Sequence, residues 1–370
     1  MASRGGLKWN YFDPDVVAAW VAEMDFGLAP GIARSLHEAV DRGDTGYFYP
    51  RAELAVAEAA VMFWADRLGW KVDPSRVFHV PDVVEGLRRS VMHLTRPGSP
   101  VVLHTPVYYP FFSMVERAGR EAILIRSTRG EDGLWRIDVE GVDRAFKAGA
   151  GSIVLCNPWN PVGRSLSHRE LAEVVSVAES HGARVLSDEV HSALTYPETR
   201  HIAASSMSPE TVVTVTAASK AWNIPGLKAA QVILTSDADR DVWESYFTPD
   251  KVGVGTFGLI ASAAAYGEVD WLDVVVDQLD RNRSVLSEAV AELLPDARLT
   301  PPQATYLAWL DLTEYGWEPP GQVILEQGRV AVSEGDHFGP GGEGHVRVNF
   351  AMDETLIVEL VERVARIPRV

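Results

Sequence analysis

Chemically active side chains follow four apolar segments of this sequence. Tyr108 comes shortly after "VVLH", Asn160 after "SIVLC", Asp188 and His191 after "RVLS", and Lys220 after "VTVTAAS". Short apolar runs bounded by turn residues predict buried β-strands. Because ligands of parallel α/β sheets bind beyond the carboxyl ends of the strands, we expect these five side chains to converge on one edge of a sheet.

Each of these residues, taken alone, has a simpler structural explanation. An Asp or Asn after a strand usually forms a turn or caps a helix, a Tyr near a Pro usually packs, and a lone Lys is usually a solvated charge. Two observations weigh against those explanations here. The side chains form a chemically complete set, and two of the six lysines, Lys220 and Lys228, flank a single turn between two apolar segments.

The set matches the requirements of pyridoxal 5′-phosphate (PLP). A lysine can join the aldehyde as a Schiff base, a carboxylate can keep the pyridine nitrogen protonated, an aromatic ring can stack on the pyridine, and an amide can reach the ring oxygen. The phosphate needs backbone N–H groups at the start of a helix. The segment "HVPDVVEGLRRSV" supplies them, with Val83 and Val84 opening an amphipathic helix.

Strands and helices alternate between residues 100 and 236. Strands are expected at 100–106, 121–127, 151–158, 183–190, 211–219 and 229–236, and helices at 108–119 and 167–182. The second helix begins with a Ser167–Glu170 capping box and ends at Gly182. Alternation of this kind is typical of an α/β fold in which helices cover both faces of a mainly parallel sheet.

The pattern changes after about residue 280. Helical periodicity appears at 281–294 and 353–367, with short strands at 305–312 and 344–351 between them. We expect a smaller α+β domain here, completed by the N-terminal segment, whose helix at 29–43 needs a surface to cover. The predicted division is a large PLP-binding domain at 46–279 and a small domain made of 1–45 and 280–370.

Composition excludes several classes of partner. The 34 basic and 51 acidic residues give a net charge of −17, which argues against binding nucleic acid or an anionic membrane. The N-terminus lacks the apolar core of a signal peptide, and the longest apolar stretch, 252–267, is short enough to be a buried helix. With Cys156 as the one cysteine and no HExxH spacing, no metal site is expected. A cytoplasmic location follows as the expectation.

The motifs resemble those of a known family, the fold-type I PLP-dependent enzymes. The resemblance is strongest to the cystathionine β-lyase-like (C–S lyase) branch, which belongs to the class I/II aminotransferase superfamily. It rests on "WVAEMDF", "GDTGYFYP", "TPVYYPF", "NPWNPVG", "SDEVHSAL", "SKAWNIPGLKAA" and "GHVRVNFA", which span nearly the whole chain in the expected order. The chain departs from the family pattern at Glu23, where Asp is common, at Val162, where Thr is common, and at Ala217, where a hydroxyl is common.

The resemblance implies a role for each residue of the set. Lys220 corresponds to the Schiff-base lysine, Asp188 to the partner of the ring nitrogen, and Tyr108 to the ring that stacks on the cofactor. Asn160 and His191 correspond to residues near the ring oxygen.

The phosphate and the subunit arrangement are implied in the same way. Ser219 and Lys228, together with the amides of Val83 and Val84, correspond to the groups that hold the phosphate. Tyr47 corresponds to a residue that reaches the phosphate of a neighbouring subunit, which implies a homodimer with shared sites.

The resemblance also implies an amino-acid substrate. Arg347, with Asn160 beside it, corresponds to the group that clamps the substrate carboxylate. The expected reaction is β-elimination from cystathionine or another cysteine S-conjugate, giving pyruvate, ammonia and a thiol. The alternative is an aminotransferase, which uses the same residues; His191 favours the lyase because simple aminotransferases commonly have Tyr at that place. A catalytically idle relative is disfavoured because Lys220 and Asp188 are both present, and no GxGxxG motif supports a dehydrogenase.

Overall fold

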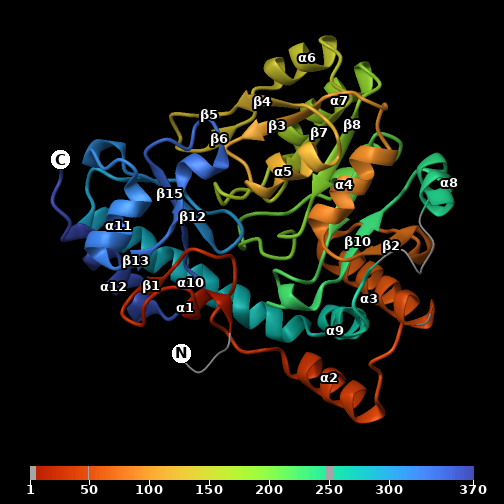
Figure 1. Ribbon diagram of the computed structural model, residues 1–370, viewed down its shortest axis with the longest axis horizontal. Helices are drawn as coiled ribbons and strands as arrows, with labels where there is room; N and C mark the ends of the chain where they lie inside the picture. Colours follow the sequence, from red (N-terminus) through yellow and green to blue (C-terminus); the bar gives the residue numbers. More distant parts are fainter. Residues whose placement is uncertain (1–5, 49, 247–252) are drawn as a thin grey trace.

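A central mixed sheet organises the larger part of the molecule. The computed structural model describes residues 6–48, 50–246 and 253–370 (Figure 1). The strands lie in the order β2 (Val77–Val80), β10 (Ala230–Ile233), β9 (Val212–Thr216), β8 (Arg184–Asp188), β7 (Ser152–Cys156), β3 (Val101–Thr105) and β4 (Ala122–Arg126). Each predicted strand between 100 and 236 is therefore confirmed.

The sheet is mainly parallel, as predicted. Strands β9, β8, β7, β3 and β4 pair in parallel, whereas β10 is antiparallel to both β2 and β9. In the register, Asp188 of β8 lies between Cys156 of β7 and Val215 of β9. This carboxylate therefore stands at the carboxyl end of the central strand, where an α/β fold places its ligand.

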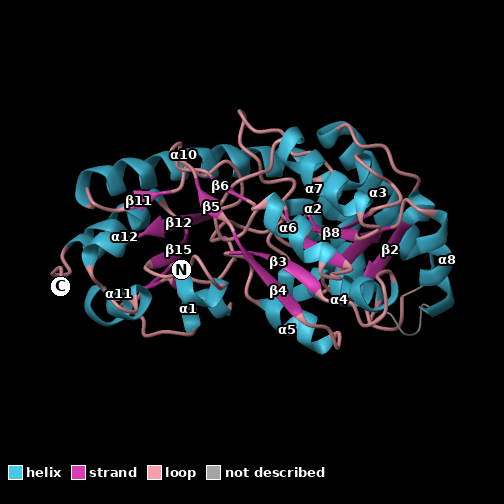
Figure 2. Cartoon of the chain, turned by 90° about the horizontal axis from the view of Figure 1, so that it is seen from above, coloured by secondary structure: helices cyan, strands magenta, loops and turns pink. Residues whose placement is uncertain are grey.

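Helices cover both sides of the sheet (Figure 2). They are α3 (Pro50–Leu68), α4 (Val83–His93), α5 (Pro110–Arg117), α6 (Val139–Lys147), α7 (His168–Ser180), α8 (Asp237–Tyr246) and α9 (Thr256–Gly267). The strands β3, β7 and β9 are buried throughout, which is why those segments are mainly apolar. The apolar stretch at 252–267 is the buried helix α9 from Thr256 onward, and Val252 lies outside the described residues.

Local signals set the helix boundaries. At the start of α7, Ser167 Oγ accepts a hydrogen bond from Glu170 N, and the Glu170 carboxylate accepts one from Ser167 N at 2.9 Å, which confirms the capping box. Gly182 follows α7 with φ of 57°. Asp82 caps α4 through Oδ1, which accepts from Glu85 N at 2.9 Å. These caps satisfy backbone groups that the helix ends would leave unpaired.

A second, antiparallel sheet lies in the C-terminal part of the chain. Its order is β11 (Arg298–Leu299), β12 (Leu307–Asp311), β15 (His345–Asn349) and β14 (Ser333–Glu334). The helices of this part are α10 (Val269–Leu293), which packs against α12 (Glu354–Ala365), and α11 (Pro320–Gly328). The predicted α+β pattern is present, but α10 starts well before residue 280, so one helix runs through the predicted domain boundary.

The N-terminal segment contacts both parts of the molecule. After α1 (Leu7–Asn10), β1 (Val17–Ala18) pairs in parallel with β13 (Val330–Ala331) next to the second sheet. Helix α2 (Pro30–Arg42), predicted at 29–43, packs against α9 instead of against the C-terminal elements (Figure 1). The division into a 46–279 domain and a 1–45 plus 280–370 domain stays a prediction.

The described residues contain neither a membrane-spanning helix nor a cluster of metal-binding side chains. None of their helices combines the length and apolarity that crossing a membrane requires. Among the same residues, no group of three or more His, Cys, Asp or Glu side chains is arranged to hold a metal ion.

The remaining short strands, β5 (Thr128–Arg129) and β6 (Trp135–Arg136), form a hairpin beside β4.

Candidate active site

A cavity of about 330 Å³ lies at the carboxyl ends of β8 and β9, in front of the first turn of α4. This is the edge at which the sequence places its chemically active side chains. Seven of the predicted residues line it: Val83, Val84, Tyr108, Asp188, Ser219, Lys220 and Lys228. Four predicted residues, Tyr47, Asn160, His191 and Arg347, do not.

Asp188 is a buried acid with an unusual proton affinity. Its carboxylate is 4% exposed and accepts a hydrogen bond from Val190 N at 3.0 Å. Burial raises the pKa of Asp188 to about 7, with a smaller contribution from the negative charge of Glu189. A nearby cation favours the ionised form of such a group. The site is therefore suited to a protonated nitrogen placed against this carboxylate.

Glu189, next in the chain, is turned away from the cavity and has a structural role. Its carboxylate accepts hydrogen bonds from Ser187 Oγ at 3.0 Å, Ala204 N at 2.8 Å and the His201 ring at 2.8 Å. All three distances fit ordinary hydrogen bonds. These bonds hold the turn after β8 in place, and with it the orientation of Asp188.

Lys220 lies within the cavity and donates from Nζ to the carbonyl oxygen of Ala22 at 2.9 Å. Burial lowers the pKa of Lys220 to about 8, and the positive charge of Arg347 contributes. Both effects disfavour the charged ammonium. A lysine with this pKa can supply a neutral amine near neutral pH, which a nucleophile or a general base requires.

The Ala22 carbonyl is held over the cavity by two asparagines. Asn223 binds both backbone groups of Met24, with Oδ1 accepting at 2.9 Å and Nδ2 donating at 2.8 Å. Asn349 Nδ2 donates to the carbonyl oxygens of Val21 at 2.7 Å and Glu23 at 2.6 Å. The sequence does not predict this contact with Lys220, because it is made by a backbone carbonyl, which carries no side-chain signal.

Tyr108 supplies an aromatic wall. Its ring packs edge-on against Phe111 with centroids 5.6 Å apart. Burial raises the pKa of Tyr108 to about 12, so the phenol is neutral near neutral pH. A neutral, fixed ring of this kind suits stacking against a flat ligand.

The start of α4, which lines the cavity, offers groups that could bind an anion. Val83 and Val84 open α4, where unpaired backbone N–H groups and the helix dipole favour negative charge. Ser219 and Lys228 line the same region. Asp82 lies there too, with Oδ2 3.1 Å from Lys228 Nζ, a contact that sequence reasoning missed. An Asp before an apolar helical run is a recognisable cap signal, but the chain sequence contains no sign of its pairing with Lys228.

Arg347 and Asn160, the predicted substrate-binding pair, contact each other. Arg347 Nη1 donates to Asn160 Oδ1 at 3.0 Å, and Nη2 donates to Trp20 O at 2.8 Å and Ser333 Oγ at 3.1 Å. The guanidinium carbon lies 5.0 Å from the Phe338 ring centroid.

No carboxylate of the described residues pairs with Arg347, which is 3% exposed, and its buried Nε has no acceptor there. Buried charges are normally paired. The guanidinium is therefore prepared to receive a carboxylate from a ligand, in the two-pronged geometry that arginine favours.

His191 lies behind the cavity and does not line it. The side chain is buried, and burial together with the charges of Lys220 and Arg347 lowers the pKa of His191 to about 3. Its ring lies edge-on to Tyr306 with centroids 6.0 Å apart. Tyr306 in turn donates to the Ala22 carbonyl at 2.9 Å, so the neutral imidazole belongs to the packing that supports Lys220.

Tyr47 does not line the cavity of its own chain. Its side chain is fully exposed between α2 and α3, and its proposed contact across a dimer stays a prediction. Its neighbour in the "GDTGYFYP" motif, Tyr49, lies outside the described residues.

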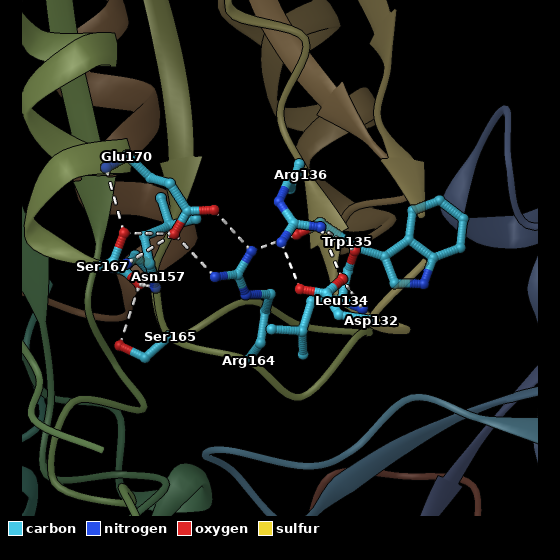
Figure 3. Close-up of polar contacts among 10 residues, drawn as sticks. Asp132, Leu134, Trp135, Arg136, Asn157, Arg164, Ser165, Ser167 and Glu170 are labelled. Carbon is cyan, nitrogen blue, oxygen red and sulfur yellow. Dashed lines mark hydrogen bonds and ion pairs between the residues drawn. The ribbon is translucent and has the colours of Figure 1, made fainter. Parts of the chain in front are cut away.

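A larger cleft of about 710 Å³ lies elsewhere and contains charged residues that pair with one another. Arg164 donates to both carboxylate oxygens of Glu170, at 2.9 and 2.8 Å, and to the carbonyl of Trp135 (Figure 3). Asn157, from the "NPWNPVG" motif, accepts from Leu166 N at 2.9 Å. The simpler explanation of a turn residue thus holds for Asn157, and these contacts join the start of α7 to β6.

Comparison with known proteins shows which family the chain belongs to. The model of the family described as aminotransferase class I and II matches residues 15–364. The chain belongs to this family. This member of the family is 35% identical to the cystathionine β-lyase of Corynebacterium glutamicum, over 99% of its own length and 98% of that protein.

Solved structures extend the similarity. A Corynebacterium diphtheriae protein proposed to be a PLP-dependent β-cystathionase is 37% identical and superimposes with a TM-score of 0.93, over 99% of this chain and 96% of that one. Cystalysin of Treponema denticola, which contains pyridoxal 5′-phosphate, is 26% identical with a TM-score of 0.90, over 98% of this chain and 95% of that one. The predicted family and the fold-type I architecture are confirmed.

The residues present fit PLP. The cavity has the volume of a small-molecule site. Asp188, the start of α4 and Lys220 all line it, so a buried carboxylate can face a ring nitrogen, the helix start can bind a phosphate, and a lysine is present to join the aldehyde. This donor set, and not the fold alone, supports the cofactor assignment.

Proposed function

We propose that this family member is a PLP-dependent carbon–sulfur β-lyase that acts on L-cystathionine or a related cysteine S-conjugate. The observation that carries the proposal is a half-buried lysine of lowered pKa, Lys220, in one cavity with the buried acid Asp188. Full-length similarity to a cystathionine β-lyase supports the choice of reaction. The overall conversion takes up one water: L-cystathionine and water give L-homocysteine, pyruvate and ammonia.

Each residue has a defined part in that reaction. When bound, PLP supplies an electron sink that makes the Cα–H of the substrate acidic. Lys220 Nζ is the base that takes this proton, because its pKa of about 8 leaves a useful fraction of neutral amine. Asp188 holds a proton on the ring nitrogen through its negative charge. Tyr108 fixes the plane of the ring by stacking.

Substrate orientation depends on Arg347. Its guanidinium binds the α-carboxylate while Asn160 and Trp20 O hold it from behind. Once the carboxylate is bound, Lys220 would remove the Cα proton, the cofactor would supply the electron sink, and the thiolate would leave from Cβ. Ser219, Lys228 and the amides of Val83 and Val84 anchor the phosphate in our assignment.

Incubation of the purified protein with L-cystathionine tests the proposal. We expect pyruvate, ammonia and homocysteine in equal amounts with no keto acid added. An aminotransferase would instead need a keto-acid acceptor such as 2-oxoglutarate and would release no thiol. Strict dependence on 2-oxoglutarate, without thiol release, would replace the lyase assignment by the aminotransferase.

We also propose that the enzyme is a cytoplasmic homodimer. The fully exposed Tyr47 supports the dimer, because an aromatic side chain so placed is available to a second subunit. A two-fold arrangement would bring two copies of Tyr47 to two shared sites. Sedimentation of the enzyme at assay concentration should give twice the chain mass, and an active monomer would contradict this.

A further inference from the structure

Asp82 lies in the proposed phosphate site, where its carboxylate contacts Lys228, one of the groups assigned to the phosphate, and the first turn of α4. Oδ1 accepts from Glu85 N at 2.9 Å in the first turn of α4. Oδ2 lies 3.1 Å from Lys228 Nζ. Asp82, Lys228 and the first residues of α4 line the same cavity. The chain therefore presents an acid of its own to the groups that should bind the cofactor phosphate.

The start of α4 determines where this carboxylate lies. Asp82 is the N-cap of α4, in extended conformation with φ of −158° and ψ of 169°. An aspartate N-cap is held by its hydrogen bond to the third residue of the helix and by the helix dipole. Its position in front of the helix follows from these two interactions, independently of Lys228.

Among the described residues, no cation other than Lys228 forms an ion pair with Asp82. Glu85 also lines the cavity, but its carboxylate is taken up by Arg88, at 2.7 and 2.8 Å, and by Arg89 at 2.6 Å. Arg117 lines the cavity and donates to Ser113 Oγ at 3.2 Å. The acid that pairs with the phosphate-binding lysine is thus Asp82.

We propose that Asp82 weakens the hold of this site on the phosphate of PLP and so sets the affinity for the cofactor. The inference rests on the proposed function, because it takes the cavity to be the PLP site. A phosphate carries between one and two negative charges near neutral pH and would have to share Lys228 and the helix start with a carboxylate. Like charges that share a site disfavour each other's ionised forms.

The consequence is an enzyme whose cofactor can exchange. Without Asp82, the same backbone amides and Lys228 would bind the phosphate unopposed. With Asp82 present, repulsion by its carboxylate cancels part of the binding free energy that the phosphate gains from these contacts. The fraction of enzyme molecules that hold PLP should then depend more strongly on the concentration of free PLP than it would in a site without Asp82.

Asp82→Asn is the variant that isolates the charge. Asparagine caps a helix about as well as aspartate, so the hydrogen bond to the first turn of α4 is kept while the negative charge is lost. We expect the Kd for PLP to fall about tenfold, which corresponds to about 1.4 kcal/mol. The affinity for pyridoxal, which has no phosphate, should stay within about twofold. Equilibrium dialysis at fixed ionic strength measures both ligands.

Asp138→Asn is the matched control. Asp138 caps α6 in the same way, with Oδ1 accepting from Gly141 N at 2.8 Å and Oδ2 lying 3.2 Å from Arg144. It does not line the 330 Å³ cavity. Its replacement should leave the Kd for PLP unchanged while altering thermal stability as much as Asp82→Asn does. Asp82→Ser, which also keeps a cap, serves if the asparagine variant does not fold.

Three results would overturn the inference. One is an unchanged or weaker affinity of Asp82→Asn for PLP. Another is a gain that pyridoxal shares, because it could not come from the phosphate. The third is an equal gain in Asp138→Asn. If the wild-type protein binds no PLP at all, the proposed function itself fails, so the two failures are distinguishable.

Discussion

Replacing Arg347 with lysine tests how the substrate carboxylate is bound. Lysine keeps the positive charge but lacks the planar pair of donors that matches a carboxylate. In this structure Arg347 also donates to Asn160 Oδ1 at 3.0 Å, Trp20 O at 2.8 Å and Ser333 Oγ at 3.1 Å, in a buried position. A single ammonium cannot satisfy these acceptors and also hold both oxygens of the substrate.

The magnitude follows from the contacts that are lost. A hydrogen bond to a charged group contributes about 1.5–3 kcal/mol. Losing one of the two hydrogen bonds to the substrate carboxylate should therefore lower kcat/KM by about 10- to 100-fold. The acceptors left unpaired at Asn160, Trp20 and Ser333 should also lower the thermal stability. Steady-state kinetics with L-cystathionine gives the first value, and thermal unfolding gives the second.

A ligand without the carboxylate separates the two effects. A thioether of cysteamine resembles the substrate but has no α-carboxylate, and it can be assayed as a competitive inhibitor. Its Ki should be the same for the wild type and for Arg347→Lys. Full kcat/KM in the variant, or an equal loss of affinity for the cysteamine thioether, would refute the assignment of Arg347 to the carboxylate.

Three further predictions concern the cavity. Asp188→Ala should lower kcat by at least about tenfold with little change in KM, because its charge matters mainly in the transition state; near-normal turnover would contradict this. Lys220→Ala should lose at least about 100-fold in turnover, and borohydride should no longer fix the cofactor to the protein; a fixed cofactor in this variant would exclude Lys220. Cofactor-free protein should gain stability as pH rises from about 8 towards 10, because Lys220 has a pKa of about 8 in the folded protein and a free lysine one of 10.5. The unfolded chain then binds more protons than the folded one, so the free energy of unfolding increases with pH. Chemical denaturation of Lys220→Met, in which the gain should vanish, checks the attribution.

Much of the fold follows from local signals. Apolar runs predict β3, β7, β8 and β9, since buried parallel strands need apolar side chains on both faces. The capping box at Ser167 and Glu170 predicts the start of α7, because it depends on residues three apart in the chain. The same strand boundaries place Asp188 and Lys220 at one edge of the sheet.

Tertiary structure decided the features that join distant residues. The antiparallel direction of β10 and the start of α10 before residue 280 depend on packing, which no local pattern encodes. The Ala22 carbonyl that binds Lys220 is 198 residues away from it, and Asp82 is 146 residues away from Lys228. The sequence by itself thus predicted the cofactor class, which the comparisons confirm, and named the residues that we propose to serve it. Their charges, partners and proton affinities depend on burial and on contacts between distant segments, which exist only in the folded molecule.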